Sequence, residues 1–156
     1  VFPYLGEDHE VVVERRSNSQ VTEDTLRLAE HHVKQTSVRR ALKRLFQREA
    51  RRRFESRAAS FANEMDVTYE AVELRNQRTL WGSCSTSGTL SLNWRLIMAP
   101  PSVIDYVIVH ELAHLIEQNH TRRFWDIVGD AMPEFSTHVE WLEDNSARLI
   151  FSEDDL

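Results

Sequence analysis

The residues best suited to chemistry lie in one short segment, where His110, Glu111 and His114 form an H-E-x-x-H pattern and His120 follows six residues later. An α-helix turns by about 100° per residue, so His110 and His114 would lie one turn apart and could bind the same ion. Glu111 would lie at the edge of that face, within reach of a water molecule on the ion. The spacing therefore predicts a metal site with a carboxylate beside it.

The third histidine sets a condition on the backbone. If the helix continued, His120 would lie on the opposite, apolar side. We therefore expect the helix to end between His114 and His120, with Asn119 as the break because asparagine tolerates the left-handed conformation. Three neutral imidazoles and one exchangeable water position suit catalytic Zn²⁺ best, although cobalt, nickel or manganese could replace zinc in vitro.

The predicted metal-binding helix is otherwise apolar. Two imidazoles and a carboxylate on such a helix would lose hydration free energy, and without a bound ion no interaction would compensate for this loss. This cost argues against the plain alternative, in which the histidines lie on a solvated helix face. The apolar positions are Ile104, Ile108, Val109, Leu112, Ala113, Leu115 and Ile116.

Length and composition fit a single domain over residues 1–156. Of the 156 residues, 41% are hydrophobic and 28% are charged, as in an ordinary globular chain. The pattern of apolar residues predicts the α+β class, with an antiparallel sheet packed on several helices that include the buried metal-binding helix. The expected segments are N-terminal strands in residues 1–35, a long basic helix at about 37–65, strands at about 67–94, the metal-binding helix at about 101–118 and C-terminal helices at about 121–149.

Local signals indicate where these segments begin. Thr36 or Ser37 could cap the long helix, and Pro101 suits the first turn of the metal-binding helix. Residues 137–140 (THVE) match a capping box and are expected to open the last helix. The buried stripe of the long helix is expected from Val38, Leu42, Leu45, Phe46, Phe54, Phe61 and Met65.

Two simple observations exclude whole classes of protein. No uncharged apolar run approaches the roughly 18 residues that a membrane helix needs, so we expect no membrane span. The single cysteine, Cys84, excludes an internal disulfide framework and a four-cysteine zinc site, and it fits a reducing compartment such as the cytoplasm. The chain begins with Val1, which is compatible with the removal of an upstream segment. Nothing in the sequence indicates the oligomeric state.

The net charge of −6 is unevenly distributed. Residues 39–57 contain nine Lys or Arg residues against Glu49 and Glu55, so this stretch carries +7 and the rest of the chain −13. The basic helix could contact a nucleic-acid backbone, which would make binding depend steeply on salt. The alternative, which the overall acidity favours, is that its arginines pair with carboxylates of the same chain.

A series of short motifs runs along the chain. They comprise residues 80–85 (LWGSCS), 92–96 (LNWRL), 99–101 (APP), 104–114 (IDYVIVHELAH), 119–120 (NH), 123–125 (RFW) and 141–142 (WL). Together they resemble the YgjP-like metallopeptidase family, which is similar to the WLM and SprT-like zincins. The resemblance covers about residues 37–142, with a weaker match at residues 4–6 (YLG).

The resemblance implies a small zincin-like domain that cleaves a peptide or protein substrate, with zinc on His110, His114 and His120 and with Glu111 catalytic. Two features depart from the family. Leu80 stands where many members have a basic residue, and the basic strand that usually precedes residues 4–6 is absent. The chain is not assigned to the metzincins, because Glu117 stands where they have glycine.

The function predicted from these observations is that of a zinc-dependent hydrolase, a metallopeptidase whose zinc-bound water is activated by Glu111. Two alternatives keep the metal. A zinc-dependent nucleotide pyrophosphatase would use the arginines, and a nucleic-acid-associated module would hold zinc structurally. A peptidase also needs a group to stabilise the oxyanion, and Arg78, Tyr69 and His138 are open candidates.

Further residues could take part in substrate binding. Ser91 and Asn93 alternate with apolar residues, so we expect them to face away from the core on a strand whose edge could pair with an extended peptide. Cys84 follows a strand in a turn and could be a nucleophile, but a packing or loop-shaping role is favoured. His31 and His32 are expected at the surface.

Overall fold

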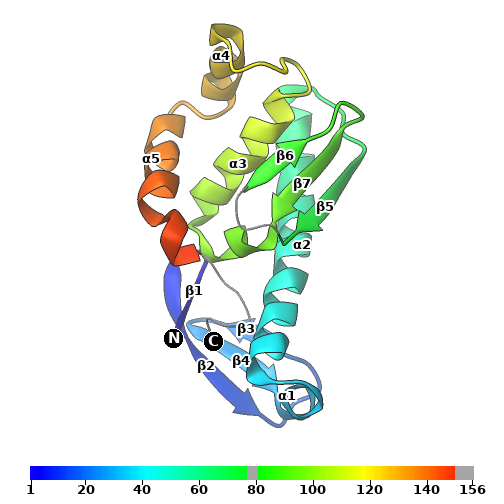
Figure 1. The fold of residues 1–156 in the computed structure, drawn as a ribbon, viewed down its shortest axis with the longest axis vertical. Coiled ribbons are helices and arrows are strands. Elements are labelled where there is room, and N and C mark those ends of the chain that lie inside the picture. Colours follow the sequence, from blue (N-terminus) through cyan, green and yellow to red (C-terminus); the bar gives the residue numbers. More distant parts are fainter. Residues whose placement is uncertain (77–80, 150–156) are drawn as a thin grey trace.

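One long helix, α2 (Val38–Met65), runs through the molecule and connects its two ends (Figure 1). The chain is described by a computed structural model over residues 1–76 and 81–149. A four-stranded sheet lies at one end of α2, and a three-stranded sheet lies beside its other end. The α+β class predicted from the sequence is confirmed.

The ends of α2 follow from local backbone chemistry. Ser37 is the N-cap, and its hydroxyl accepts a hydrogen bond of 3.1 Å from the backbone N–H of Arg40. The helix ends at Asp66, which adopts the left-handed conformation with φ of 56°. Val38, expected in the buried stripe, is 42% exposed because it lies in the first turn. The buried residues of α2 are Ala41, Leu42, Leu45, Phe46, Ala50, Phe54, Ala58, Phe61 and Ala62.

The N-terminal part contains β1 (Phe2–Tyr4), β2 (Glu7–Glu14), β3 (Gln20–Thr22), β4 (Thr25–Ala29) and α1 (Glu30–Gln35). The strands form a mixed sheet of order β1-β2-β4-β3, in which β2 and β4 are parallel. The expectation of strands throughout residues 1–35 is wrong for α1. Lys34 Nζ lies 3.1 Å from Glu30 Oε1, one turn away, and this ion pair favours a helix there.

The second sheet contains β5 (Ala71–Arg75), β6 (Gly82–Cys84) and β7 (Thr89–Asn93) in the order β5-β7-β6. A tight turn with Gly88 at φ of 94° joins β6 and β7, so these two strands are antiparallel. β5 and β7 are parallel, because the chain reverses its direction once between β5 and β6 and again between β6 and β7. The predicted antiparallel sheet is therefore corrected to two mixed sheets.

The remaining elements are η1 (Trp94–Met98), α3 (Pro101–Ala113), α4 (Arg122–Ala131), α5 (Phe135–Asn145) and η2 (Ser146–Leu149). α5 begins at Phe135, so the capping box expected at residues 137–140 lies inside the helix and does not open it. Within the described ranges, no helix has both the length and the apolar character that crossing a membrane requires.

α3 is shorter than expected. It ends at Ala113 rather than near residue 118, and tighter bonds replace the α-helical pattern after it: Leu115 N–H donates to Leu112 O, and Ile116 N–H to Ala113 O. Asn119 was expected to provide the break in a left-handed conformation. It does not, since Leu5, Glu23 and Asp66 are the non-glycine residues with positive φ in the described chain.

α3 is held in the centre of the molecule, where it packs against α2, α4, α5 and β6 (Figure 1). Ile104, Ile108, Val109 and Leu112 are at most 1% exposed, so this helix contributes much of the core. An ion pair fixes α3 to the long helix, because Arg57 donates from Nε and Nη2 to the two carboxylate oxygens of Asp105 at 2.9 and 3.1 Å.

The N-terminal sheet is attached to the start of α3 through one tight turn. The backbone N–H groups of Leu5 and Gly6 donate to Ile97 O and Met98 O at 2.8 and 2.9 Å. Gly6 has φ of 82°, and a Cβ atom there would lie 2.9 Å from Pro100 Cγ. Both the backbone conformation and the close approach therefore require glycine.

We expect Gly6→Ala to lower the free energy of unfolding by at least about 1–2 kcal/mol, because alanine is strained at positive φ and its Cβ would collide with Pro100. Urea denaturation measures this loss. Gly129→Ala is the matched control, because a Cβ there would make an ordinary contact of 3.6 Å with Phe135 inside α4. Equal stability of the two variants would contradict the assignment of Gly6.

Candidate functional site

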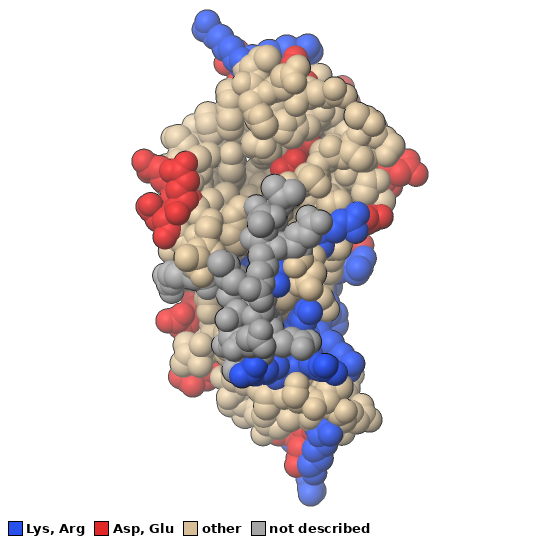
Figure 2. All heavy atoms as spheres, in the orientation of Figure 1, with Lys and Arg blue, Asp and Glu red and all other residues tan. Residues whose placement is uncertain are grey.

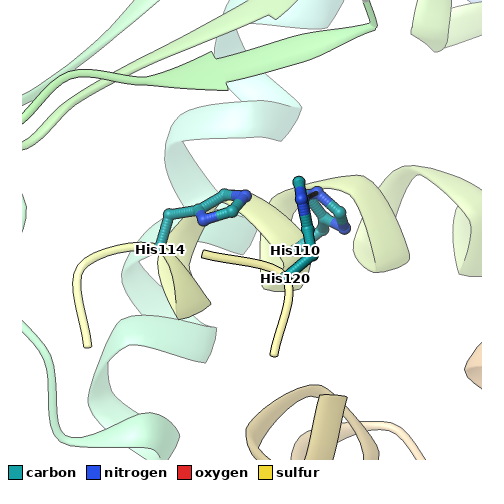
Figure 3. A group of neighbouring side chains, drawn as sticks. All are labelled: His110, His114 and His120. Carbon is teal, nitrogen blue, oxygen red and sulfur yellow. Dashed lines mark hydrogen bonds between the residues drawn. The ribbon is translucent and has the colours of Figure 1, made fainter. Parts of the chain in front are cut away.

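His110, His114 and His120 meet at the C-terminal end of α3 (Figure 3). One ligand atom from each ring lies within 4.8 Å of the others, and Nε2 of His110 is 3.3 Å from Nε2 of His120. The first two histidines lie one helical turn apart, as their spacing predicts. The third returns to them from outside the helix.

The early end of α3 is what allows His120 to return. His114 is the C-cap of α3, and its Nδ1 lies 3.3 Å from the backbone oxygen of Glu117, so the loop folds back on His114. The loop ends at Thr121, whose hydroxyl accepts from Phe124 N–H and starts α4. His120 is thus held between two capped helix ends rather than on a helix.

The rings of His110 and His114 are oriented by hydrogen bonds at Nδ1. His110 Nδ1 lies 3.2 Å from the hydroxyl of Tyr106, one turn earlier on α3, and His114 Nδ1 faces the backbone oxygen of Glu117. When Nδ1 is the protonated nitrogen, Nε2 carries a free lone pair. In both rings Nε2 is thus the nitrogen available to a ligand.

Aromatic residues of α4 form the floor under the three imidazoles. The ring of Phe124 is fully buried, and its centroid lies 4.5 to 5.0 Å from the centroids of all three histidine rings. Trp125 lies 5.8 Å from His110 and 6.0 Å from His120. The sequence analysis did not place these residues at the site, although their position just after His120 was an available signal.

Burial favours the neutral form of His110 and His114. Desolvation, together with the smaller effect of the neighbouring His114 and His120, lowers the pKa of His110 to about 4. Burial also lowers the pKa of His114. Neutral imidazole is the form that binds a metal cation, so at neutral pH the two residues of α3 do not need to lose a proton first.

Glu111 faces the same cleft and is 6% exposed. Burial raises the pKa of its carboxyl group to about 7, and a cation beside it would lower that value again. The cleft has a volume of about 490 Å³. Its lining among the described residues comprises Gly82, Ser83, Cys84, Ser85, Thr86, His110, Glu111, His114, Gln118 and His120.

β6 passes directly over Glu111, and Gly82 makes this possible. A Cβ atom at Gly82 would lie 3.1 Å from Cγ and from Oε2 of Glu111, and 3.2 Å from Cδ2 of Leu92. These distances are shorter than the contacts that a Cβ atom normally makes. Residue 82 therefore has to be small for Glu111 to keep its position.

The structure corrects the interpretation of Ser91 and Asn93. Their strand, β7, is the middle strand of its sheet, so both of its edges are already paired, with β5 and β6. Both side chains are buried, and Asn93 Oδ1 accepts hydrogen bonds from the backbone and a guanidinium N–H of Arg95. A substrate therefore cannot pair with β7, and the side chain of Asn93 instead caps η1.

Other expected participants lie in different places. Cys84 lines the cleft, and burial together with the charge of Glu111 raises the pKa of its thiol, which disfavours a nucleophilic thiolate. Of the proposed oxyanion donors, Arg78 lies outside the described residues. Tyr69 and His138 are not among the residues that line the cleft, although the ring of His138 is 6.4 Å from that of Tyr106.

The basic residues of α2 gather along the middle of the molecule, and acidic residues lie at the opposite edge over α5 (Figure 2). Several of these arginines pair with carboxylates of the same chain, among them Arg57 with Asp105, Arg51 with Glu55 and Arg52 with Glu49. The expected nucleic-acid contact thus gains no support, and of these pairs Arg57–Asp105 uses a carboxylate from outside the basic stretch.

Two of the three histidines have the separation of ligands on one zinc ion. Two nitrogen ligands about 2.0–2.1 Å from a tetrahedral zinc ion are separated by about 3.3–3.4 Å, which matches the 3.3 Å between Nε2 of His110 and Nε2 of His120. Three nitrogen ligands leave a fourth position open toward the cleft. The histidines could therefore hold a catalytic metal.

Comparisons with known proteins identify the family of the chain. The model of a family described as YgjP-like, metallopeptidase domain, matches residues 1–145. Among solved structures, the crystal structure of the metallopeptidase zymogen of Pyrococcus abyssi abylysin is similar, with a TM-score of 0.53 and 19% sequence identity over 58% of this chain and 93% of that chain. The crystal structure of the metallopeptidase zymogen of Methanocaldococcus jannaschii jannalysin has a TM-score of 0.48 and 17% sequence identity, over 56% of this chain and 94% of that chain. A search of curated proteins finds no match. The likeness to abylysin shows a shared fold.

We expect the protein to bind one zinc ion per chain and to unfold at a higher temperature when zinc is present, because a ligand that binds only the folded state stabilises it. Loss of a residue that only hydrogen-bonds to a metal ligand weakens metal binding by about 10- to 100-fold, and we expect His120→Ala to weaken zinc binding by more than that. Isothermal titration calorimetry measures both affinities. His31→Ala, at an exposed position of α1, should bind zinc like the wild type. Unchanged affinity in His120→Ala would exclude this histidine as a ligand.

Proposed function

Because the chain belongs to the YgjP-like metallopeptidase family, we propose that it is a zinc-dependent peptidase in which His110, His114 and His120 hold the metal and Glu111 is the general base. One observation carries the proposal. The three imidazoles converge beside a buried carboxylate that faces the same cleft.

The roles of the residues follow from their positions. Zinc, when bound, would act as a Lewis acid that polarises the scissile carbonyl and makes water more acidic. Glu111 accepts a proton from the attacking water molecule and delivers it to the leaving amine. The aromatic floor formed by Phe124 and Trp125 keeps bulk water away from the ligands on the protein side.

The free edge of β6 favours a peptide as the substrate. β6 is an outer strand of its sheet, and its residues Gly82, Ser83 and Cys84 line the cleft beside Glu111. An extended peptide can pair with such an edge through its backbone. Pairing on β6 replaces the pairing that was expected on β7, and it would place a peptide bond of the substrate next to the three histidines.

The cleft gives less support to the other two functions. Among its described lining residues there is no lysine or arginine to bind the phosphates of a nucleotide. A structural zinc site needs a fourth protein ligand, whereas the metal-binding group of the described residues consists of three histidines. Peptide hydrolysis is the reaction that both observations favour.

Glu111→Gln is the direct test. We expect this variant to bind zinc with nearly the affinity of the wild type and to lose about 100- to 10,000-fold in kcat/KM, because the amide cannot accept the proton. The assay uses a casein-like protein, with nucleoside triphosphates measured in parallel. Glu140→Gln, at an exposed position of α5, is the matched control and should keep full activity. Full activity of Glu111→Gln would refute the mechanism.

Gly82→Ala tests the placement of Glu111 by β6. The new Cβ would require the Glu111 side chain to move by a few tenths of an ångström. Because a displacement of about 1 Å at a reacting group can reduce the rate by about 100-fold, this smaller shift should cost less than that. We expect kcat to fall while zinc affinity stays close to that of the wild type. Gly129→Ala controls for the added methyl group. Wild-type kcat in Gly82→Ala would show that Glu111 does not need this close contact.

A further inference from the structure

The hydroxyl of Tyr106 is the one side-chain group of the described residues that hydrogen-bonds to Nδ1 of His110. The two residues lie one turn apart on α3, with the hydroxyl 3.2 Å from Nδ1 and the ring centroids 5.8 Å apart at an interplanar angle of 67°. Tyr106 is 6% exposed, so water has little access to this hydrogen bond. The bond is partly buried, so it restrains the imidazole more than an exposed hydrogen bond would.

His110 and His114 are supported in different ways. Nδ1 of His114 faces a backbone oxygen, that of Glu117, which is present whatever side chain stands at position 117. Nδ1 of His110 faces a side chain, so its support depends on the residue at position 106. A metal that takes Nε2 of His110 leaves a proton on Nδ1, and that proton needs an acceptor inside the protein.

We propose that Tyr106 is the positioning residue of the metal site: its hydroxyl accepts the Nδ1–H bond of His110 and thereby directs Nε2 of His110 toward the metal. This inference rests on the proposed function, because it requires a metal on the three histidines. Tyr106 does not line the cleft, so it acts through His110 and not on the substrate.

A phenol suits this position because it can both accept and donate a hydrogen bond. In the metal-loaded protein it accepts from Nδ1–H. In the metal-free protein it can instead donate to an unprotonated Nδ1, so the ring of His110 stays in place in either tautomer. The site is therefore prepared before the metal arrives, which favours tight binding.

Tyr106→Phe separates the hydrogen bond from packing, since phenylalanine keeps the ring and removes only the hydroxyl. Tyr4→Phe is the matched control, because Tyr4 is a similarly buried tyrosine, 8% exposed, that stacks on Phe46 in another part of the molecule. Zinc affinity is measured for both variants by competition with a chelator. The Nδ1–H proton signals of His110 and His114 are followed by NMR in the zinc-loaded proteins.

We expect Tyr106→Phe to bind zinc about 10- to 100-fold more weakly than the wild type, and Tyr4→Phe to bind it equally well. The Nδ1–H signal of His110 should shift in Tyr106→Phe because its acceptor is lost, while that of His114 should stay in place. Wild-type zinc affinity in Tyr106→Phe, or an unshifted His110 signal, overturns this proposal alone. Absence of zinc binding by the wild type overturns the proposed function and this proposal together.

Discussion

The point at which α3 ends is the constraint on which the site depends. His110 and His114 need a helix to share one face, whereas His120 can reach them only if the helix stops directly after His114. The chain meets both demands with a tighter final turn and a short loop that Thr121 closes at the start of α4. A helix longer by one turn would carry His120 away from its partners.

The surroundings of the histidines follow from the burial of α3. Because α3 packs against α2, α4, α5 and β6, burial shifts the pKa values of His110 and Glu111 toward the neutral forms. Phe124 and Trp125 complete the enclosure from α4. The same low polarity that would make isolated charges costly prepares the site for a cation and its neutral ligands.

Local patterns predicted the long elements well and the boundaries less well. The helix expected at 37–65 spans Val38–Met65, because its apolar period is long and Ser37 caps it. The sequence analysis missed α1, the early end of α3 and the start of α5. The periodicity of apolar residues is nearly the same whether a helix is one turn longer or shorter. The parallel pairing of β2 with β4 and of β5 with β7 depends on contacts between distant segments, which periodicity does not describe.

By itself, the sequence determined how His110, Glu111 and His114 lie relative to one another, since their spacing fixes their positions on any helix and helix geometry is the same in every protein. Only the tertiary structure decided what surrounds them. It buried Ser91 and Asn93 by placing β7 in the middle of its sheet. It also placed Gly82 against the side chain of Glu111, and the ring of Phe124 against the three histidine rings. These contacts join separate elements, and packing, rather than local spacing, selects which elements meet.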